Sequence, residues 1–197
     1  MRATKSLQTS LFDDGPDLPE GMTYAENIIP FSEEERLVRY IAGLPLKPFE
    51  FVGGLTGNRR VISFGWRYDF GSHKLKQADD IPAPLLSLRG KAATLAGMKP
   101  LTLQQVLVTE YAPGAGIGWH KDRPQFDQVV GVSLLAPCNF RLRRKTGEKW
   151  ERKSLTVQPR SAYLLSGAAR AGWEHSIPTV AQLRYSVTFR SFVRSPQ

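Results

Sequence analysis

The chain has 197 residues and a mass of 22.0 kDa, with 41% hydrophobic and 23% charged residues, values typical of one globular domain. They argue against a disordered, collagen-like or coiled-coil chain. The longest apolar runs, such as residues 134–137, are far shorter than the roughly 20 residues of a membrane-spanning helix. No apolar stretch follows the first residues, so we expect no secretory signal, no membrane partner and a cytoplasmic protein.

Cysteine content and charge narrow the function classes further. Cys138 is the only cysteine, which excludes an internal disulfide and a thiolate metal cluster and is consistent with a reducing compartment. Lysine and arginine number 27 against 18 aspartate and glutamate residues, for a formal net charge of +9. Such an excess favours a polyanionic partner, most simply nucleic acid.

The N-terminal segment differs in composition from the rest of the chain. Residues 1–24 contain few apolar residues and several turn formers, namely Gly15, Pro16, Pro19 and Gly21. This composition predicts a flexible N-terminal arm followed by a single domain over residues 25–197.

Two helices are predicted in the first half of the chain. Ser32 stands three residues before Glu35, a capping-box pattern, and apolar residues follow at helical spacing over residues 37–44. A second helix is predicted over residues 85–95, after a proline and before Gly97.

The remaining pattern predicts strands. A glycine-rich turn at residues 53–58 precedes a predicted strand over residues 60–68. After Pro100, short strands separated by turn residues are predicted at 101–111, 128–135, 140–144, 151–157, 162–165 and 183–192. This spacing is typical of a closed or sandwiched antiparallel β architecture. We therefore predict an α+β, mainly β fold with the N-terminal helices packed on one outer sheet.

Positive charge concentrates in the segment 140–153, which is predicted to form a hairpin turning at residues 146–148. Its basic residues outnumber Glu148 and Glu151; they are Arg141, Arg143, Arg144, Lys145, Lys149, Arg152 and Lys153. We interpret Arg143 and Arg144 as substrate contacts to phosphate, with a merely solvated hairpin as the alternative.

A candidate metal site combines three side chains. His120 and Asp122 are two residues apart, so on a strand both would project to the same side. His175 lies far enough along the chain for several strands to return it to the same cavity. Two imidazoles and one carboxylate form the facial triad that binds non-haem Fe(II) and leaves positions open. The pattern alone is weak, because such residues also occur at these spacings by chance.

The C-terminal strand adds a second signal. Its residues alternate strictly, and one face carries Arg184, Ser186, Thr188 and Arg190. A buried guanidinium group needs an anionic partner, and its planar fork suits carboxylates. Inside a barrel these arginines would therefore bind a dicarboxylate, whereas on a surface strand they would lie in water.

Four sequence blocks resemble the AlkB-type Fe(II)/2-oxoglutarate-dependent dioxygenases. In chain order they are Tyr111-Ala-Pro-Gly-Ala, His120-x-Asp122, His175-Ser-Ile-Pro and Arg184-Tyr-Ser-Val-Thr-Phe-Arg190. The last block is the most specific. The resemblance implies a double-stranded β-helix, or jelly-roll, core over residues 101–193. It implies helices and a nucleotide-recognition region over residues 25–100.

The same resemblance implies roles for individual residues. His120, Asp122 and His175 would be catalytic and would hold Fe(II). Five residues would contact 2-oxoglutarate: Tyr111, Thr109, Arg184, Ser186 and Arg190. Arg184 would pair with the distal carboxylate, Arg190 would act near the metal-binding end and Tyr111 would donate its hydroxyl. Thr109 and Ser186 stand where the family often has asparagine, and both keep a hydrogen-bonding group.

The implied activity is oxidative demethylation of alkylated nucleobases in DNA or RNA. It uses Fe(II) with 2-oxoglutarate and O2 as co-substrates, and releases formaldehyde, succinate and CO2. Trp66 and Tyr68 are predicted substrate contacts, with core packing as the alternative for Trp66. Arg123 stands near where related demethylases often have an acidic residue, and either Asp127 or Glu110 is a candidate replacement.

Other functions stay open on the sequence alone. The same chemistry would also serve a tRNA-modifying or protein-modifying enzyme. A non-catalytic basic RNA-binding module and a zinc hydrolase with the same three ligands are further alternatives, although the hydrolase leaves Arg184 and Arg190 unexplained. We expect a monomer that acts on single-stranded DNA or RNA.

Overall fold

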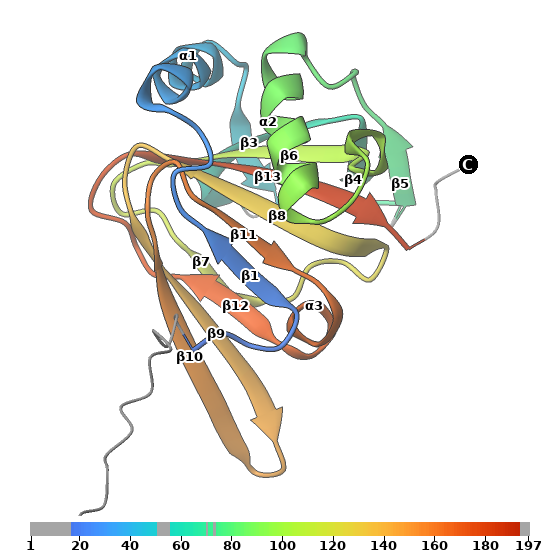
Figure 1. The fold of residues 1–197 in the computed structure, drawn as a ribbon, viewed down its shortest axis with the longest axis vertical. Coiled ribbons are helices and arrows are strands. Elements are labelled where there is room, and N and C mark those ends of the chain that lie inside the picture. The colour runs from blue at the N-terminus through green and yellow to red at the C-terminus, as the bar shows by residue number, and fades with distance from the viewer. Residues whose placement is uncertain (1–16, 51–55, 70, 73, 194–197) are drawn as a thin grey trace, which may run out of the picture.

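The computed structural model describes residues 17–50, 56–69, 71–72 and 74–193, and Figure 1 shows its layered arrangement. Two antiparallel sheets face each other, and helices cover the outer face of the larger sheet. This confirms the predicted α+β, mainly β fold with a jelly-roll core. Within the described residues, no helix is long and apolar enough to cross a membrane.

The strands form two main sheets and one small hairpin. The larger sheet has the order β1 (Met22–Ala25), β11 (Ala162–Leu165), β8 (Phe126–Leu134), β13 (Arg184–Phe192), β6 (Gln105–Tyr111), β3 (Thr56–Phe64) and β2 (Lys47–Glu50). The smaller sheet has the order β10 (Lys149–Val157), β9 (Cys138–Thr146), β12 (Glu174–Ile177) and β7 (Ile117–His120). The separate hairpin pairs β4 (Trp66–Asp69) with β5 (Lys74–Gln77).

The helices connect and cover these strands. Helix α1 (Phe31–Ala42) and helix α2 (Ala83–Leu95) pack on the larger sheet, and α2 confirms the helix predicted over residues 85–95. The short helix α3 (Gly167–Gly172) joins β11 to β12, and a 3-10 turn at Pro100–Thr102 precedes β6.

Strand β13 separates two hydrophobic cores, because alternate side chains point to opposite faces of a sheet. Val187 and Phe189 pack with the helices in the first core. The opposite face carries Arg184, which lies across from Tyr111, a member of the second core between the sheets. The predicted alternation is therefore confirmed, and the arginine face points into the barrel.

The start of helix α1 differs from the prediction. Pro30 is the N-cap residue, and no side chain caps the helix, so the predicted capping box of Ser32 and Glu35 is wrong. The fixed φ of proline and its extended ψ begin the helix two residues earlier than predicted, which places Ser32 inside the first turn. Glu34, which is buried, instead accepts hydrogen bonds from the Leu135 amide and the Arg160 guanidinium.

The strand predicted over residues 60–68 is interrupted. Gly65 has a φ of +73°, and a Cβ there would lie 2.1 Å from the Gln104 carbonyl oxygen, so only glycine fits. The chain therefore turns at Gly65 and divides the predicted strand into β3 and β4. Strand β3 joins the larger sheet, so the predicted boundary at residue 101 does not separate the sheet from what precedes it.

The predictions for the N-terminal arm and the glycine-rich turn are wrong in part, and the described residues do not test the rest. Residues 1–16 and 51–55 lie outside the described residues. The arm is wrong for residues 22–24, because β1 pairs with β11 at the edge of the larger sheet and buries Met22 in the second core. The turn is wrong for residues 56–58, which belong to β3.

Gly131 on β8 leaves room for the Tyr163 ring inside the barrel. A Cβ at Gly131 would lie 2.3 Å from that ring, whereas a Cβ at Gly90 in α2 would meet nothing within 4 Å. We predict that Gly131→Ala lowers the free energy of unfolding by about 1–3 kcal/mol, because a packed core resists added volume. Gly90→Ala is the control and should be neutral or stabilising by up to about 1 kcal/mol. Urea unfolding of both variants measures this, and equal effects would contradict the packing.

Candidate active site

Two short strands of the smaller sheet bring the histidines together. β7 and β12 run antiparallel with His120 directly opposite His175, and the two ring centroids lie 4.2 Å apart. Both strands have only four residues, and neither was predicted from the sequence. Cross-strand neighbours share one face of a sheet, so both imidazoles point into the barrel.

Asp122 reaches the same space by a different route from the one predicted. β7 ends at His120, so Asp122 lies in the following loop and the same-face argument for a strand does not apply. Its Oδ2 atom nevertheless lies 3.7 Å from Nε2 of His175. The structure therefore gathers all three predicted ligand side chains around His175.

Arg190 fixes the Asp122 carboxylate. Its Nε and a terminal nitrogen lie 3.0 Å and 2.8 Å from Asp122 Oδ1, and its other terminal nitrogen donates to Gln105 Oε1 at 2.9 Å. Burial alone would raise the pKa of Asp122, but Arg190 and the neighbouring positive charges hold it at about 2. The carboxylate is therefore ionised, with Oδ1 engaged and Oδ2 directed at His175.

The imidazoles are neutral near pH 7 and are held by their surroundings. Burial lowers the pKa of His175 to about 3 and also lowers the pKa of His120. Nδ1 of His120 lies 2.8 Å from the Gly118 carbonyl oxygen, and when Nδ1 carries the proton, Nε2 is left as a ligand atom. The Phe140 ring stacks on His175 at 5.3 Å. Neutral imidazole is the form that binds metals.

Two neutral imidazoles and one carboxylate are a donor set that suits Fe(II). Among the described residues, however, no group of three or more His, Cys, Asp or Glu side chains is arranged to hold a metal ion as it stands. Oδ1 of Asp122 is bound to Arg190 instead. An iron ion here would be held by His120, Asp122 and His175, and this ligand set stays a prediction.

Arg184 is the most unusual side chain of the barrel interior. It is only 1% exposed, donates one hydrogen bond to Ser133 Oγ at 2.9 Å, and lies 4.7 Å above the Tyr111 ring. Its Nε and other terminal nitrogen make no hydrogen bond within the described residues. A buried cation with unsatisfied donors is costly, and a carboxylate would satisfy both of them. This geometry fits the distal carboxylate of 2-oxoglutarate.

A row of hydroxyl groups runs beside Arg184. Ser186 on β13 lies between Thr109 on β6 and Ser133 on β8 in the same register, and all three are buried. Thr109 and Ser186 were predicted as co-substrate contacts. Ser133 was missed, although a lone hydroxyl in the apolar run of β8 was an available signal.

Two further arginines near the site were also missed. Arg59 on β3 is 6% exposed, with its guanidinium 4.8 Å from the Phe49 ring and 5.8 Å from the Tyr111 ring, and its charge contributes to the low pKa of His120. Arg170 of α3 donates hydrogen bonds to the backbone oxygens of Arg123 and Phe126. These two bonds hold the loop that follows Asp122. Sequence offers no local sign of either role.

The predicted substrate contacts on β4 are packed against neighbouring elements. Trp66 makes an edge-to-face contact with Phe192 at 6.1 Å, as the packing alternative expected. The Arg123 guanidinium lies 4.2 Å over the Tyr68 ring, so Tyr68 borders the loop that follows Asp122. Of the two residues, Tyr68 is therefore the one that contacts the loop following Asp122. Base recognition by either residue stays a prediction.

Glu110 is wrong as a replacement for the acidic residue near the target base. It makes a bidentate ion pair with Arg60 at 2.7 Å and 2.8 Å, on the face of β6 opposite to Tyr111. Adjacent strand residues point to opposite faces, so Glu110 points away from the barrel interior. Asp127 is exposed at the start of β8.

The comparisons with known proteins agree with this geometry. The model of the 2OG-Fe(II) oxygenase superfamily matches residues 54–190. The chain belongs to this superfamily. It is 26% identical over 196 residues to the "Alkylated DNA repair protein ALKBH8 homolog" of Arabidopsis thaliana, covering 87% of this chain and 54% of that one. It is 29% identical over 114 residues to the "Probable RNA/DNA demethylase ALKBH6" of Danio rerio, covering 58% and 46%.

A solved structure, "The structure of OsALKBH1", has the same fold, with a TM-score of 0.69, 16% identity and coverage of 88% of this chain and 98% of that one. The AlkB-type resemblance is confirmed. The matched superfamily consists of oxygenases that use Fe(II) and 2-oxoglutarate, which agrees with the donor set of the candidate site. The chain spans about half the length of the curated relatives.

The unsatisfied donors of Arg184 generate a prediction. Arg184→Met should weaken 2-oxoglutarate binding by at least about 100-fold, because a lost partner in a buried charge pair costs about 3–5 kcal/mol. The unfolding free energy without 2-oxoglutarate should be unchanged or higher, since an unpaired buried charge is removed. Thermal unfolding with and without 2-oxoglutarate measures both effects. Arg39→Met on α1 is the control, and a full 2-oxoglutarate shift in Arg184→Met would rule out this role.

The low pKa of His175 generates a second prediction. Because burial depresses the folded-state pKa to about 3, its contribution to stability is complete above pH 6.5 and is lost as the pH falls. Metal-free protein should therefore lose stability between pH 7 and pH 4.5, and His175→Gln should lose on the order of 2 kcal/mol less. Urea unfolding at both pH values measures this. The same loss in both proteins would show that His175 is not buried as described.

Proposed function

We propose that the protein oxidatively demethylates alkylated bases in single-stranded DNA or RNA. The observation that carries the proposal is the convergence of His120, Asp122 and His175 in the barrel that also holds the unsatisfied donors of Arg184. The net charge of +9 and the names of two relatives, an alkylated DNA repair protein homologue and a probable RNA/DNA demethylase, favour a nucleic acid substrate.

Each residue of the site would have its own part in the reaction. Bound Fe(II) and 2-oxoglutarate would allow O2 to oxidise a methyl C–H bond, while 2-oxoglutarate is converted to succinate and CO2. Arg184 and Ser133 would hold the distal carboxylate of the co-substrate, and Arg190 would keep Asp122 ionised and oriented. The resulting N-hydroxymethyl group breaks down to the free base nitrogen and formaldehyde.

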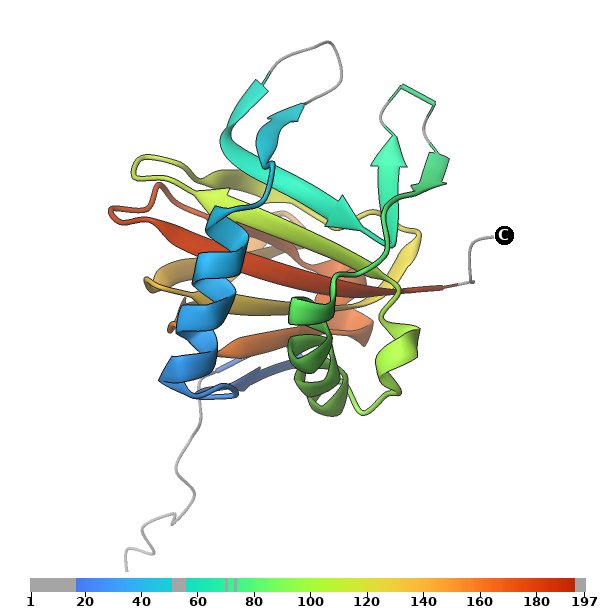
Figure 2. The ribbon, with the colours of Figure 1, turned by 90° about the horizontal axis from the view of Figure 1, so that it is seen from above.

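Two hairpins are candidates for contact with the substrate. Figure 2 shows that β2–β3 and β4–β5 stand out from the same side of the molecule. Tyr68 of β4 touches Arg123 of the loop that follows Asp122, so the β4–β5 hairpin borders the metal loop. An aromatic residue beside a guanidinium group is suited to stacking an extruded base.

The direct test is turnover by the purified chain with Fe(II), 2-oxoglutarate and methylated oligonucleotides. The panel includes single-stranded and duplex DNA, RNA, bulk tRNA and a methylated peptide, because tRNA and protein are the alternative substrates. Mass spectrometry should show loss of methyl groups, with formaldehyde and succinate formed together. Succinate formation without loss of methyl from any nucleic acid would refute the proposal.

The predicted ligand set generates a variant test. Asp122→Ala should lower Fe(II) affinity and demethylation by at least about 100-fold, because it removes the anionic ligand. Glu35→Ala removes an exposed carboxylate on α1, away from the candidate site, and is the matched control. Fe(II) binding measured under anaerobic conditions and single-turnover assays give the two readouts. Activity of Asp122→Ala equal to that of the control would contradict the assignment.

A further inference from the structure

The outer face of the smaller sheet carries a basic pocket on the side opposite the histidines. It has a volume of about 540 Å³ and is lined by Trp119, Asn139, Arg141, Leu142, Arg152, Lys153 and Ser154. Trp119 precedes His120 on β7 and therefore points to the other side of the sheet. We call this surface the outer-sheet pocket, and it is separate from the barrel interior.

Two guanidinium groups in the outer-sheet pocket have hydrogen-bond donors without a partner among the described residues. Arg141 donates from Nε to Ser176 Oγ at 3.2 Å and lies 5.1 Å from the Trp119 ring. Its terminal nitrogens make no hydrogen bond or ion pair in the described part of the chain. Arg152 is exposed and forms no ion pair with any described residue. Ser154, directly opposite Arg141 on β10, adds a hydroxyl group.

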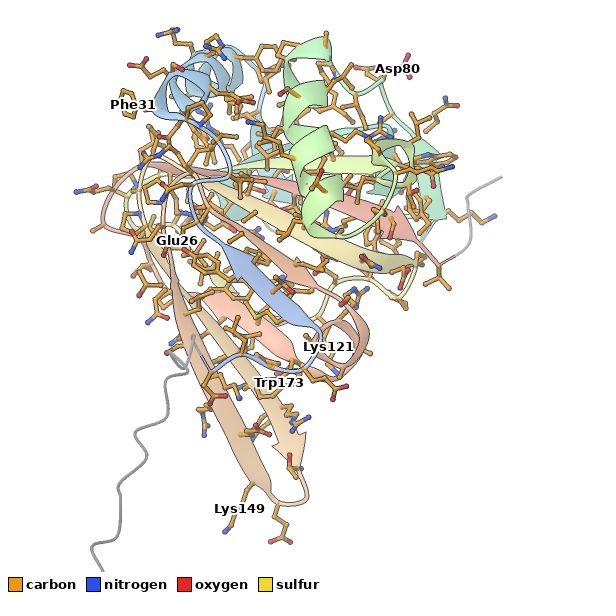
Figure 3. The ribbon with its side chains drawn as sticks, viewed as in Figure 1. Glu26, Phe31, Asp80, Lys121, Lys149 and Trp173 are labelled. Carbon is orange, nitrogen blue, oxygen red and sulfur yellow. The ribbon has the colours of Figure 1, made fainter. Side chains whose placement is uncertain are left out.

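The other hairpin arginines are already paired. Arg143 forms an ion pair with Glu174 at 2.6 Å and lies between the Trp119 and Trp150 rings. Arg144, the other predicted phosphate contact, forms an ion pair with Glu151 at 2.6 Å. Lys153, which also lines the outer-sheet pocket, forms an ion pair with Asp17, so the unpaired positive charge of the pocket lining belongs to Arg141 and Arg152. Figure 3 shows that the hairpin, with Lys149 at its tip, extends well beyond the rest of the molecule.

We propose that the outer-sheet pocket binds the phosphodiester backbone of the polynucleotide substrate, at nucleotides other than the one presented to the metal site. The inference rests on the proposed function and names a second contact surface for the same substrate. Guanidinium, amide and hydroxyl donors around one pocket suit phosphate oxygens. The sheet lies between the outer-sheet pocket and the histidines, so one nucleotide cannot occupy both.

The experiment compares two double variants of the full chain with equal charge loss. Arg141→Gln with Arg152→Gln empties the outer-sheet pocket of free charge, and Arg36→Gln with Arg39→Gln removes two exposed arginines from α1. Fluorescence anisotropy measures binding of an unmodified single-stranded oligonucleotide over a range of salt concentrations. The pocket variant should bind at least about 10-fold more weakly, and its slope of log affinity against log salt should fall by about 1.4. The α1 variant should stay within about twofold of wild type.

Three controls make the outcomes distinct. An unchanged thermal shift with 2-oxoglutarate shows that each variant is folded, and Arg152→Gln alone replaces the pair if folding fails. Arg141→Lys with Arg152→Lys should recover much of the binding, because charge is retained. Polyglutamate that competes as well as an oligonucleotide would overturn the assignment to phosphodiesters.

Equal losses in the pocket and α1 variants, or no loss in either, would overturn the outer-sheet pocket and leave demethylation in place. A wild-type chain that binds no DNA or RNA would contradict both.

Discussion

The ion pair between Arg190 and Asp122 joins the two sheets at the candidate active site. Arg190 comes from β13 of the larger sheet, and Asp122 follows β7 of the smaller one. Because Asp122 lies in a loop, no strand pairing fixes its carboxylate. The guanidinium group of Arg190 does so, and Gln105 in turn orients Arg190. Without this contact the Asp122 carboxylate, the predicted third ligand, would have no fixed place beside the two histidines.

Two arginines place positive charge inside the barrel, and each requires an anionic partner. Arg190 has Asp122 as its partner, whereas Arg184 retains two buried donors with none in the described residues. Interiors tolerate a buried guanidinium group only when an anion accompanies it. The two unsatisfied donors of Arg184 therefore suggest an anionic ligand, and the carboxylate of a keto-diacid co-substrate would satisfy them.

The sequence was informative where one strand carries the signal. The alternation of β13 separated the arginine face from the apolar face, and the run of short strands after residue 100 predicted the sandwich. Recognition of the family came from residues of several strands read together, and the superfamily match supports it. Predictions based on a single segment are correct because the local periodicity of its residues determines which face is buried.

The sequence was uninformative where the role of a residue depends on a distant partner. β7 and β12 are too short for a periodic pattern, and the pairing of His120 with His175 depends on register. Arg170 and Ser133 acquire their roles from contacts with residues more than 40 positions away. The capping box failed for the opposite reason, since the local pattern was present but Pro30 began the helix.

A crystal structure of the protein with Mn(II) in place of Fe(II), grown with 2-oxoglutarate, tests the central claim most directly. The account predicts one metal ion bound by His120, Asp122 and His175, with the distal carboxylate of 2-oxoglutarate on Arg184. A metal ion bound by other side chains, or a co-substrate seated away from Arg184, would contradict it.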